Sequence, residues 1–291
     1  MILTSLVTTP APSVAMQIAQ GFVSAIALGR HGGAPVIVAH AAEALPAGAV
    51  TPALNDQNIA DRRAVGQAVS RVLGQLGGRQ RRLALVLPDS VAKVSLVRLQ
   101  SVPARTQDLA ELIRWHVRKS APFPLEEAQV TYSPGAATLE GGREFVVALA
   151  RRAVVREFEG VCEEAGAHAG IVDLATFSLV NAVLAAEGPM TGDWLLVHIT
   201  PDYGSIVILR GQDLIFFRSR AEGSDESLPD LVHQTAMYYE DRLGGHGFAR
   251  VMVTGSGGEG WTPAAAPTTF DDIRRQIDAR LGVRTETVDP Q

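Results

Sequence analysis

Hydrophobic and polar residues alternate with a period of two near the N-terminus, and the period becomes helical further along the chain. Residues 14–18 and 22–28 alternate on either side of a short turn, which predicts a β-hairpin. Residues 36–38 predict a third short strand. Apolar side chains at helical spacing predict a helix over residues 58–76, which two glycines end. The apolar run at residues 83–88 has the length of a buried strand.

The second half of the chain repeats this layout. A hairpin and a third strand are predicted at residues 194–199, 205–209 and 214–218. A helix at residues 228–243, a strand at residues 251–254, a helix at residues 270–281 and a last short strand follow. The pattern therefore predicts an internal duplication, without detectable sequence identity between the halves.

A different unit lies between the two repeats. Residues 93–99 alternate, and Thr106 is expected to cap a helix that must stop before Pro122. Strands at residues 130–132 and 145–150 and a helix at residues 154–165 complete a βαββα-like pattern. This segment interrupts the repeated plan.

Composition limits the class of protein. The net charge of −5, with both signs interspersed, gives no reason to expect a nucleic-acid partner. The single cysteine, Cys162, excludes an internal disulfide and fits a reducing compartment. The chain lacks the run of about 20 apolar residues that a spanning helix needs, and its first residues lack the basic region of a signal peptide. We expect a soluble, cytoplasmic protein that reaches a membrane only through a partner.

The most informative stretch is residues 113–132, with the pattern IRW-x6-PFPLEE-x4-Y. Taken as pattern alone, it predicts a connector from helix to strand with an aromatic residue in the core. The stretch closely resembles the PilM family, the actin-like cytoplasmic proteins of type IV pilus assembly. Residues 148–177 and 281–290 resemble the same family, in the same order. The resemblance extends over most of the chain from Leu83 to Pro290.

The resemblance implies an α/β fold of the actin-like, ribonuclease H-like class, a bilobed duplication with an inserted subdomain of the FtsA/PilM type. It divides the chain into a first actin-like subdomain (residues 1–88), the inserted subdomain (89–173) and a second actin-like lobe (174–291). The lid of the second lobe, at residues 221–249, is short and has room for one main helix.

Actin-like ATPases hold phosphates on two hairpin turns that carry carboxylates and glycines, and the first turn is followed by a lysine. The matching positions of this chain are Gln17, Ala19 and Ser24 in the first hairpin, and His198 and Thr200 in the second. Gln and His are poor magnesium ligands, because this hard ion prefers carboxylate oxygen. Asp202 lies in the second turn, where an aspartate is more often a turn former. We expect a degenerate phosphate site.

The glycine-rich end of the strand at residues 251–254 is what is left of the nucleotide site. In the family such glycines approach the adenine and ribose, and here they are Gly255, Gly257 and Gly258. The spacing also matches a dinucleotide fingerprint, but the sequence after Gly260 cannot begin the helix that this fingerprint needs. We therefore expect a vestigial adenosine loop with no cofactor, and favour neither ATP nor Mg²⁺ binding.

The resemblance also implies a partner, the cytoplasmic N-terminal peptide of the inner-membrane protein PilN. The family captures this peptide in a cleft edged by residues 83–125, through main-chain hydrogen bonds and an apolar pocket. The residues expected to contact the peptide are Arg114, Trp115, Arg118 and Phe123. The alternative, of similar weight, places Trp115 and Phe123 in the core of the inserted subdomain.

Taken together, these observations predict a cytoplasmic scaffold of a type IV pilus platform that is a pseudo-ATPase and not an enzyme. Two alternatives stay open, an active actin-like ATPase and an adaptor like the cytoplasmic domain of GspL in type II secretion. Neither His116, expected to pack, nor Cys162, expected to be buried, is a catalytic candidate. The adjacent pair Glu126 and Glu127 is expected in a solvated turn, and no metal site is expected.

Overall fold

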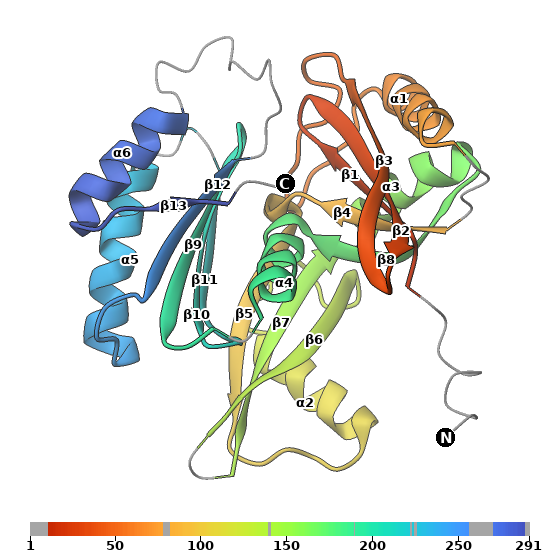
Figure 1. Ribbon diagram of the computed structural model, residues 1–291. Coiled ribbons are helices and arrows are strands. Elements are labelled where there is room, and N and C mark those ends of the chain that lie inside the picture. The colour runs from red at the N-terminus through yellow and green to blue at the C-terminus, as the bar shows by residue number, and fades with distance from the viewer. Residues whose placement is uncertain are drawn as a thin grey trace. The chain divides into compact units, whose positions relative to one another are not determined.

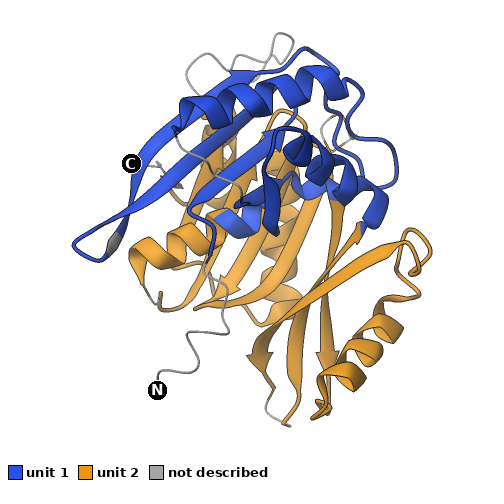
Figure 2. Cartoon of the chain, turned by 90° about the vertical axis from the view of Figure 1, so that its right-hand side faces the viewer, with its two compact units in different colours: residues 1–91, 151–178 blue, residues 92–150, 179–291 orange. Residues whose placement is uncertain are grey.

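The computed structural model describes residues 11–77, 82–138, 141–188, 190–221, 223, 226–255 and 270–288. It divides into two compact units (Figures 1 and 2). The first contains residues 1–91 and 151–178, and the second contains residues 92–150 and 179–291. Each unit is built on a five-stranded sheet.

The sheet of the first unit has the order β3-β2-β1-β4-β8. Its strands are β1 (Val14–Ala19), β2 (Phe22–His31), β3 (Ala34–Ala44), β4 (Arg82–Leu87) and β8 (His168–Leu174). The first three pair antiparallel, whereas β4 and β8 continue the sheet in parallel from β1. The predicted hairpin of β1 and β2 is confirmed, and β2 and β3 extend beyond it as a longer two-stranded ribbon.

Two helices, α1 (Arg62–Gln75) and α3 (Arg152–Glu164), pack against each other and against the strands of this sheet. Every second residue of β1 and β4 is buried, which follows from the period-two pattern of the sequence. The helix α1 begins at Arg62, four residues later than predicted, and Asp61 caps it by accepting the N–H of Ala64 at 2.9 Å.

The residues before α1 are not helical because Asn58 is fully buried and uses its side chain to fold the preceding loop. Its amide oxygen accepts the N–H of Ala53 at 2.8 Å, and its amide nitrogen donates to the carbonyl oxygens of Ala53 and Asp56. An asparagine that satisfies backbone groups in this way favours a loop over a helix. This local preference explains the late start of α1.

The sheet of the second unit has the order β11-β10-β9-β12-β13, which repeats the order of the first sheet. Its strands are β9 (Asp193–Ile199), β10 (Tyr203–Arg210), β11 (Asp213–Ala221), β12 (Arg250–Gly255) and β13 (Glu286–Thr287). Again three antiparallel strands are followed by two parallel ones. The repeated order confirms the internal duplication that the sequence predicted.

Two helices, α5 (Leu228–Leu243) and α6 (Phe270–Leu281), pack on this second sheet with the limits that the sequence predicted. Ion pairs join strands of this sheet, among them Arg250 on β12 with Glu286 on β13. The helix α5 ends at Gly244, which has a left-handed backbone (φ 65°). A side chain on the next glycine, Gly245, would meet the ring of Tyr239 at 2.1 Å. The close packing of Tyr239 therefore requires glycine there.

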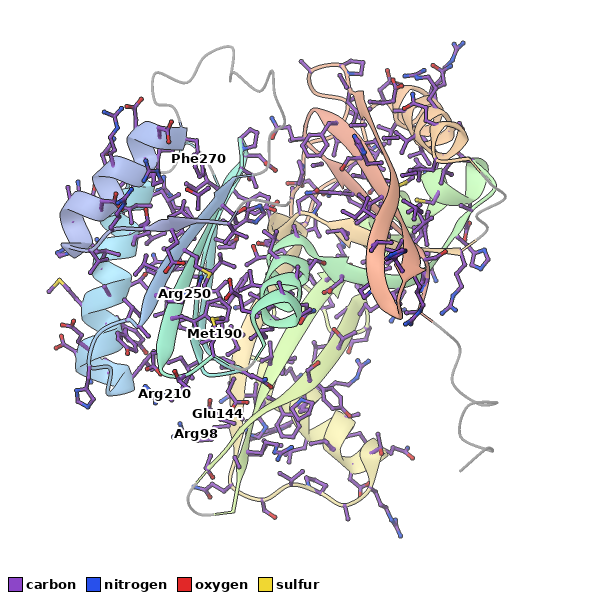
Figure 3. All side chains as sticks on the ribbon, in the orientation of Figure 1. Arg98, Glu144, Met190, Arg210, Arg250 and Phe270 are labelled. Carbon is purple, nitrogen blue, oxygen red and sulfur yellow. The ribbon has the colours of Figure 1, made fainter. Side chains whose placement is uncertain are left out.

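A second, three-stranded sheet in the same unit has the order β5-β7-β6. Its strands are β5 (Ala92–Leu99), β6 (Ala128–Ala137) and β7 (Arg143–Arg151), with helix α2 (Thr106–Val117) packed against β5. Arg98 on β5 bonds Glu144 on β7 at 2.6 Å (Figure 3). This sheet with α2 is the interruption that the sequence predicted.

Two details of α2 differ from the sequence-based expectation. The capping position is Arg105, which makes no side-chain cap, and Thr106 is the first residue inside the helix. His116 was expected to pack, and one of the two interpretations of Trp115 placed it in the core, yet both side chains are exposed. The apolar side is narrower, because Ile113 and Val117, with Leu109 and Leu112 beside them, are enough to cover the sheet.

The compact units divide the chain differently from the three-domain division, which stays a prediction. Strand β8, which the residue pattern did not reveal, pairs in parallel with β4 and so completes the first sheet. Residues 151–178, including α3 and β8, therefore lie in the first unit, although the sequence assigned residues 89–173 to the insertion. The helix α4 (Ala175–Glu187) then leads into the second unit. Among the helices that the structure describes, none is both long enough and apolar enough to cross a bilayer.

Candidate functional site

The first hairpin turn lies between β1 and β2. Gln17 on β1 is paired with Ser24 on β2, so both side chains point to the same face of the sheet. The turn itself contains Gly21, with a left-handed φ of 90°. Neither Gln17 nor Ser24 carries a charge, and this turn therefore offers no charged ligand for phosphate or magnesium.

One carboxylate lies in the same cross-strand row, and sequence reasoning did not assign it a role. Gln17 pairs with Val86, and Val86 pairs with Asp173 on β8. Asp173 thus lies two strands from Gln17, roughly 10 Å away at the usual strand spacing. Burial raises the pKa of Asp173, although bonds from the Leu174 N–H and the Ser178 hydroxyl oppose that shift. The one signal for Asp173 in the sequence was its position within residues 148–177, which resemble the PilM family.

The second hairpin turn, between β9 and β10, is closed by its own groups. The N–H of Thr200 donates to the carbonyl oxygen of Tyr203 at 2.9 Å. The N–H of Tyr203 donates to the hydroxyl oxygen of Thr200 at 3.0 Å. A phosphate-binding turn directs such N–H groups at its ligand. Here both are already bonded within the turn.

His198 occupies the position of the second phosphate carboxylate. It pairs with Ser205 on β10 and with Thr254 on β12, which makes a polar row across the second sheet. The imidazole is fully buried and meets the ring of Tyr203 edge to face at 5.6 Å. Burial lowers the pKa of His198 to about 4. The ring is therefore neutral at pH 7 and cannot replace a carboxylate.

Asp202 is the only carboxylate within residues 200–203 of the second turn. Its Oδ1 accepts the Thr200 hydroxyl at 3.0 Å, while its buried Oδ2 has no hydrogen-bond partner among the described residues. Burial raises the pKa of Asp202, and the bond from Thr200 opposes that shift. The contact with Thr200 agrees with the expected role of Asp202 as a turn former.

The glycine-rich segment begins at the end of β12. Gly255 is its first residue, and a Cβ atom there would meet the ring of Phe270 at 2.9 Å. Gly257 and Gly258 lie outside the described residues. The vestigial adenosine loop formed by these three glycines therefore stays a prediction.

The C-terminal half of α2 presents a basic, aromatic surface to solvent. Trp115 is 67% exposed, and Arg114 and Arg118 lie one helical turn apart beside it. Neither arginine makes an ion pair or side-chain hydrogen bond within the part of the chain that the structure describes. The exposure excludes the alternative that Trp115 belongs to the core of the inserted subdomain.

Phe123 behaves differently from Trp115. It is partly buried and packs against the hydrophobic cluster under α2, which contains Ile113, Val117 and Phe145. The two prolines that flank Phe123 are exposed, and they restrict the backbone on both sides of the ring. The ring therefore supports the core of the inserted sheet.

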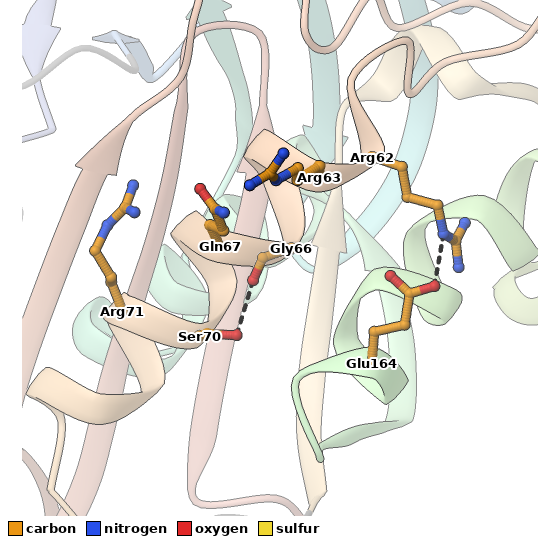
Figure 4. A pocket seen from close by; sticks show the side chains of 7 residues that line it. All are labelled: Arg62, Arg63, Gly66, Gln67, Ser70, Arg71 and Glu164. Carbon is orange, nitrogen blue, oxygen red and sulfur yellow. Dashed lines mark hydrogen bonds and ion pairs between the residues drawn. The ribbon is translucent and has the colours of Figure 1, made fainter.

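A shallow depression of about 410 Å³ lies on the helices of the first unit (Figure 4). It is lined by the side of α1 from Arg62 to Arg71 together with Glu164 of α3. Arg62 bonds Glu164 at 2.7 Å, and Arg71 bonds Glu43 at 3.0 Å. Arg63 also lines the depression, so three arginines and one glutamate face it and the lining is basic on balance.

The remaining candidates of the sequence have structural roles. His116 Nδ1 lies 2.9 Å from the carbonyl oxygen of Leu112, and the ring is exposed. Cys162 is buried, and burial raises the pKa of its thiol to about 12, with Glu159 and Glu163 adding to the shift. Glu126 and Glu127 are both exposed, as expected for a solvated turn. Among the described residues, no group of three acidic, histidine or cysteine side chains could hold a metal ion.

Comparison with known proteins gives one family match. A family model described as type IV pilus assembly protein PilM matches residues 15–242. A solved structure of a PilM–PilN type IV pilus biogenesis complex is similar with a TM-score of 0.79 and 17% identity. The match covers 97% of this chain and 89% of that chain.

Two further solved structures share the fold at lower similarity. One is a protein of Bacteroides thetaiotaomicron with an actin-like ATPase fold and unknown function (TM-score 0.52, 8% identity, 95% of this chain and 90% of that chain). The other is the cytoplasmic domain of EpsL, an inner-membrane component of the type II secretion system of Vibrio cholerae. Its TM-score is 0.50 at 9% identity, and the match covers 92% of this chain and 93% of that chain. These similarities agree with the actin-like fold class that the sequence predicted.

Proposed function

Because the chain belongs to the family of the type IV pilus assembly protein PilM, we propose that it is a scaffold that binds the cytoplasmic N-terminal peptide of a PilN-like inner-membrane protein. The solved relative with the TM-score of 0.79 is a PilM–PilN complex, which supports this partner. Its place in the cell would then be the cytoplasmic side of the inner membrane, reached through that partner.

The observation that carries the peptide-binding proposal is the exposed surface of α2. Large aromatic side chains and arginines dominate the binding energy of many interfaces. Here Trp115 is exposed between Arg114 and Arg118, and neither guanidinium has a partner among the residues that the structure describes. Trp115 offers an apolar face for a leucine-like side chain, and the arginines offer donors for peptide carbonyl or carboxylate groups. Phe123 would border this surface.

We also propose that the protein is a pseudo-ATPase. Hydrolysis of ATP by an actin-like protein needs a carboxylate to position magnesium and free N–H groups to hold the phosphates. In this chain Gln17 and a neutral, buried His198 stand at the carboxylate positions. The N–H groups of Thr200 and Tyr203 are bonded inside the second turn. These contacts support the loss of hydrolysis.

The peptide proposal is tested by measuring capture of a synthetic PilN N-terminal peptide by the full chain, with Arg114→Glu as the variant. We expect Arg114→Glu to weaken capture at least tenfold, because a charge reversal replaces a donor with a repelling group. The matched control is Arg143→Glu on β7, an exposed arginine of the same inserted sheet. If Arg114→Glu captures the peptide as well as Arg143→Glu does, α2 is not the recognition surface.

A further inference from the structure

The depression on α1 and α3 has no role in the functions proposed above, and its lining consists mostly of hydrogen-bond donors. Arg62, Arg63 and Arg71 face it with the amide of Gln67, and Glu164 is the one acidic residue among its described lining residues. Helix α1 itself contains no acidic residue. A surface on which several donors gather selects a ligand with several acceptor oxygens, such as carboxylate or phosphate groups.

Arg63 is a free cation on this surface. It is exposed, and it makes no ion pair or side-chain hydrogen bond to any residue that the structure describes. Figure 4 shows Arg63, Gln67 and Arg71 projecting from the same side of α1. Arg63 and Arg71 are two helical turns apart, which is roughly 12 Å along the helix axis. This spacing favours a ligand with separate acidic groups over one small anion.

Arg62 and Arg71 are oriented by acids of the same unit and still keep donors for a ligand. Nε of Arg62 donates to Glu164 at 2.7 Å, and Nε of Arg71 donates to Glu43 at 3.0 Å. In each guanidinium the two terminal nitrogens make no hydrogen bond within the described residues. Roughly half of each arginine side chain is exposed, and ion pairs at such surfaces are weak. The terminal nitrogens are therefore available to an incoming carboxylate.

A glycine in the middle of α3 makes room for Arg62. A Cβ atom at Gly160 would lie 2.5 Å from Nη2 of Arg62. The backbone of Gly160 does not have the positive φ that would require glycine, and glycine inside a helix is less stable than alanine. The position of Arg62 is thus the structural reason for this glycine, which keeps the guanidinium beside the depression.

We propose that this depression binds an acidic segment of a partner protein, with carboxylates on Arg63 and on the terminal nitrogens of Arg62 and Arg71. An extended chain rises about 3.3 Å per residue, so acidic residues about four positions apart match the spacing of Arg63 and Arg71. The inference is independent of the proposed function, because the depression lies in the first compact unit and α2 lies in the second.

Other ligands of the same charge fit this surface less well. A small molecule needs a concave and mostly apolar pocket, whereas this depression is shallow and lined by polar side chains and a glycine. A bilayer surface needs apolar side chains that enter it, and none is found among the described lining residues. A nucleic acid would hold a long row of phosphates against a chain with a net charge of −5. A short acidic segment confines its negative charge to the depression.

The attraction is local and should be sensitive to salt. Two further acids lie beside the arginines, and both are already bonded. Glu43 accepts from Arg71 and Gln75, and Asp61 accepts the N–H of Ala64. These acids reduce the positive potential of the surface, but neither bonds Arg63. We therefore expect binding at low ionic strength that weakens steeply as salt is added.

The test measures binding of a fluorescently labelled peptide of eight glutamates to the full chain by fluorescence anisotropy at low salt. This peptide should bind, and a Gly-Ser peptide of equal length should not. Arg63→Glu should weaken binding about tenfold, because a charged hydrogen bond is replaced by a repulsion. The matched control, Arg242→Glu, makes the same change of charge at an exposed residue of α5 in the second unit and should bind like the unchanged protein. No binding by the unchanged protein, or equal weakening by the two variants, would overturn the proposal.

Gly160→Ala tests the arrangement of Arg62 without a change of charge. The added methyl group should displace the guanidinium and weaken binding of the glutamate peptide about threefold or more. The variant should still fold with an unreduced melting temperature, because the methyl group meets the end of a flexible side chain and alanine favours a helix. Gly74→Ala on α1 is the control, since a Cβ atom there meets nothing within 4 Å. Equal binding by the two alanine variants would show that Arg62 is not part of the site and would contradict the proposed contacts.

The class of ligand is tested by competition. Sodium phosphate should displace the glutamate peptide no better than sodium chloride of the same ionic strength, and an oligothymidine of eight nucleotides should bind more weakly than the peptide. Specific displacement by phosphate, or tighter binding of the oligonucleotide, would show that the site takes a different ligand and that the proposal is wrong. Arg63→Glu should still capture the PilN N-terminal peptide, so this inference and the proposed function can fail separately. Loss of that capture would mean that the depression serves the PilN peptide and no second partner.

Discussion

Glu157 on α3 accepts the backbone N–H of Asn58 at 2.8 Å, across 99 residues of sequence. The same oxygen, Oε2, also accepts the N–H of Ile59 at 3.0 Å. One carboxylate thus satisfies two consecutive partly buried donors of the loop that precedes α1. The loop is fixed to the helix that follows the inserted segment, within the same compact unit.

Replacing Glu157 by alanine should therefore destabilise the protein. Two backbone N–H groups would lose their acceptor, and we expect the free energy of unfolding to fall by about 2–3 kcal/mol. Urea denaturation followed by circular dichroism measures this change. Glu157→Gln should recover most of the lost stability, because the amide oxygen can still accept both bonds. As a control, Glu163→Ala changes an exposed residue of the same helix and should alter stability by less than ~0.5 kcal/mol. Equal stability of Glu157→Ala and Glu163→Ala would contradict this role.

Replacing Trp115 by alanine should leave stability almost unchanged. A buried aromatic costs about 3–5 kcal/mol when it is truncated, but Trp115 is 67% exposed and lies outside the core cluster. We expect a change in melting temperature of no more than about 2 °C. Phe123→Ala is the comparison, because its partly buried ring should cost clearly more. A large loss of stability in Trp115→Ala would return this residue to the core of the inserted subdomain.

The acid stability of the second unit should depend on Asp193. Burial alone would raise the pKa of Asp193, but hydrogen bonds from Arg210 and Tyr239 and the charge of Arg210 lower it overall. A lowered pKa contributes stability above the ordinary value of 3.8, and this stability is lost as the pH falls through the lower folded value. Asp193→Asn should therefore be less stable than the unchanged protein at pH 7, by about 1–3 kcal/mol for its charged hydrogen bonds. Denaturation at pH 7 and pH 3 should show this difference shrinking in acid, and a constant difference would refute the assignment.

Cys162 should resist alkylation in the folded protein. With a pKa of about 12, only about one thiol in ten thousand is ionised at pH 8, and the thiolate is the reactive form. Iodoacetamide followed by mass spectrometry should show no modification within an hour at pH 8, and full modification in urea. Rapid labelling of the folded protein would mean that α3 opens readily.

ATP should be neither hydrolysed nor bound at ordinary concentrations. We expect no magnesium-dependent release of phosphate above that of the variant His198→Ala, and no calorimetric signal with ATP and Mg²⁺. The reason is the absence of charge at Gln17 and His198 and the internal bonding of Thr200. Turnover that His198→Ala abolishes, or micromolar binding of ATP, would favour the alternative of an active ATPase.

The order of elements could be predicted from the sequence because each depends on local periodicity. The limits of α5 and α6 were predicted to the residue, and those of α5 follow from its caps at Ser227 and Gly244. Strand β8 was missed, since its pattern of buried and exposed residues does not alternate strictly. Its place in the sheet is decided by β4, 86 residues away in the pairing of Arg82 with His168. A single-sequence pattern does not contain that information.

The candidate sites were predictable to a different degree. The identities of Gln17 and His198 are read directly from the sequence, but the burial of His198 and the closed bonding around Thr200 depend on tertiary packing. The sequence left Trp115 open between the peptide surface and the core, because helical spacing alone does not decide which way it points. The structure shows that Val117 and Ile113 already fill that side. Spacing therefore identified the helix, whereas the direction of its largest side chain became clear only from the packing of the core.

The pairing of β4 with β8 has a consequence for the order of folding during synthesis. The two strands are neighbours in one sheet, yet the inserted sheet and α3 are made between them. A ribosome that adds about 5–20 residues per second has completed the inserted sheet before β8 exists. Until then β4 is an unpaired edge, and closing so long a loop is slow. The inserted sheet can therefore fold while the first compact unit still lacks its last strand, β8. A nascent chain stalled near residue 150 would then present the α2 surface on an incompletely folded protein.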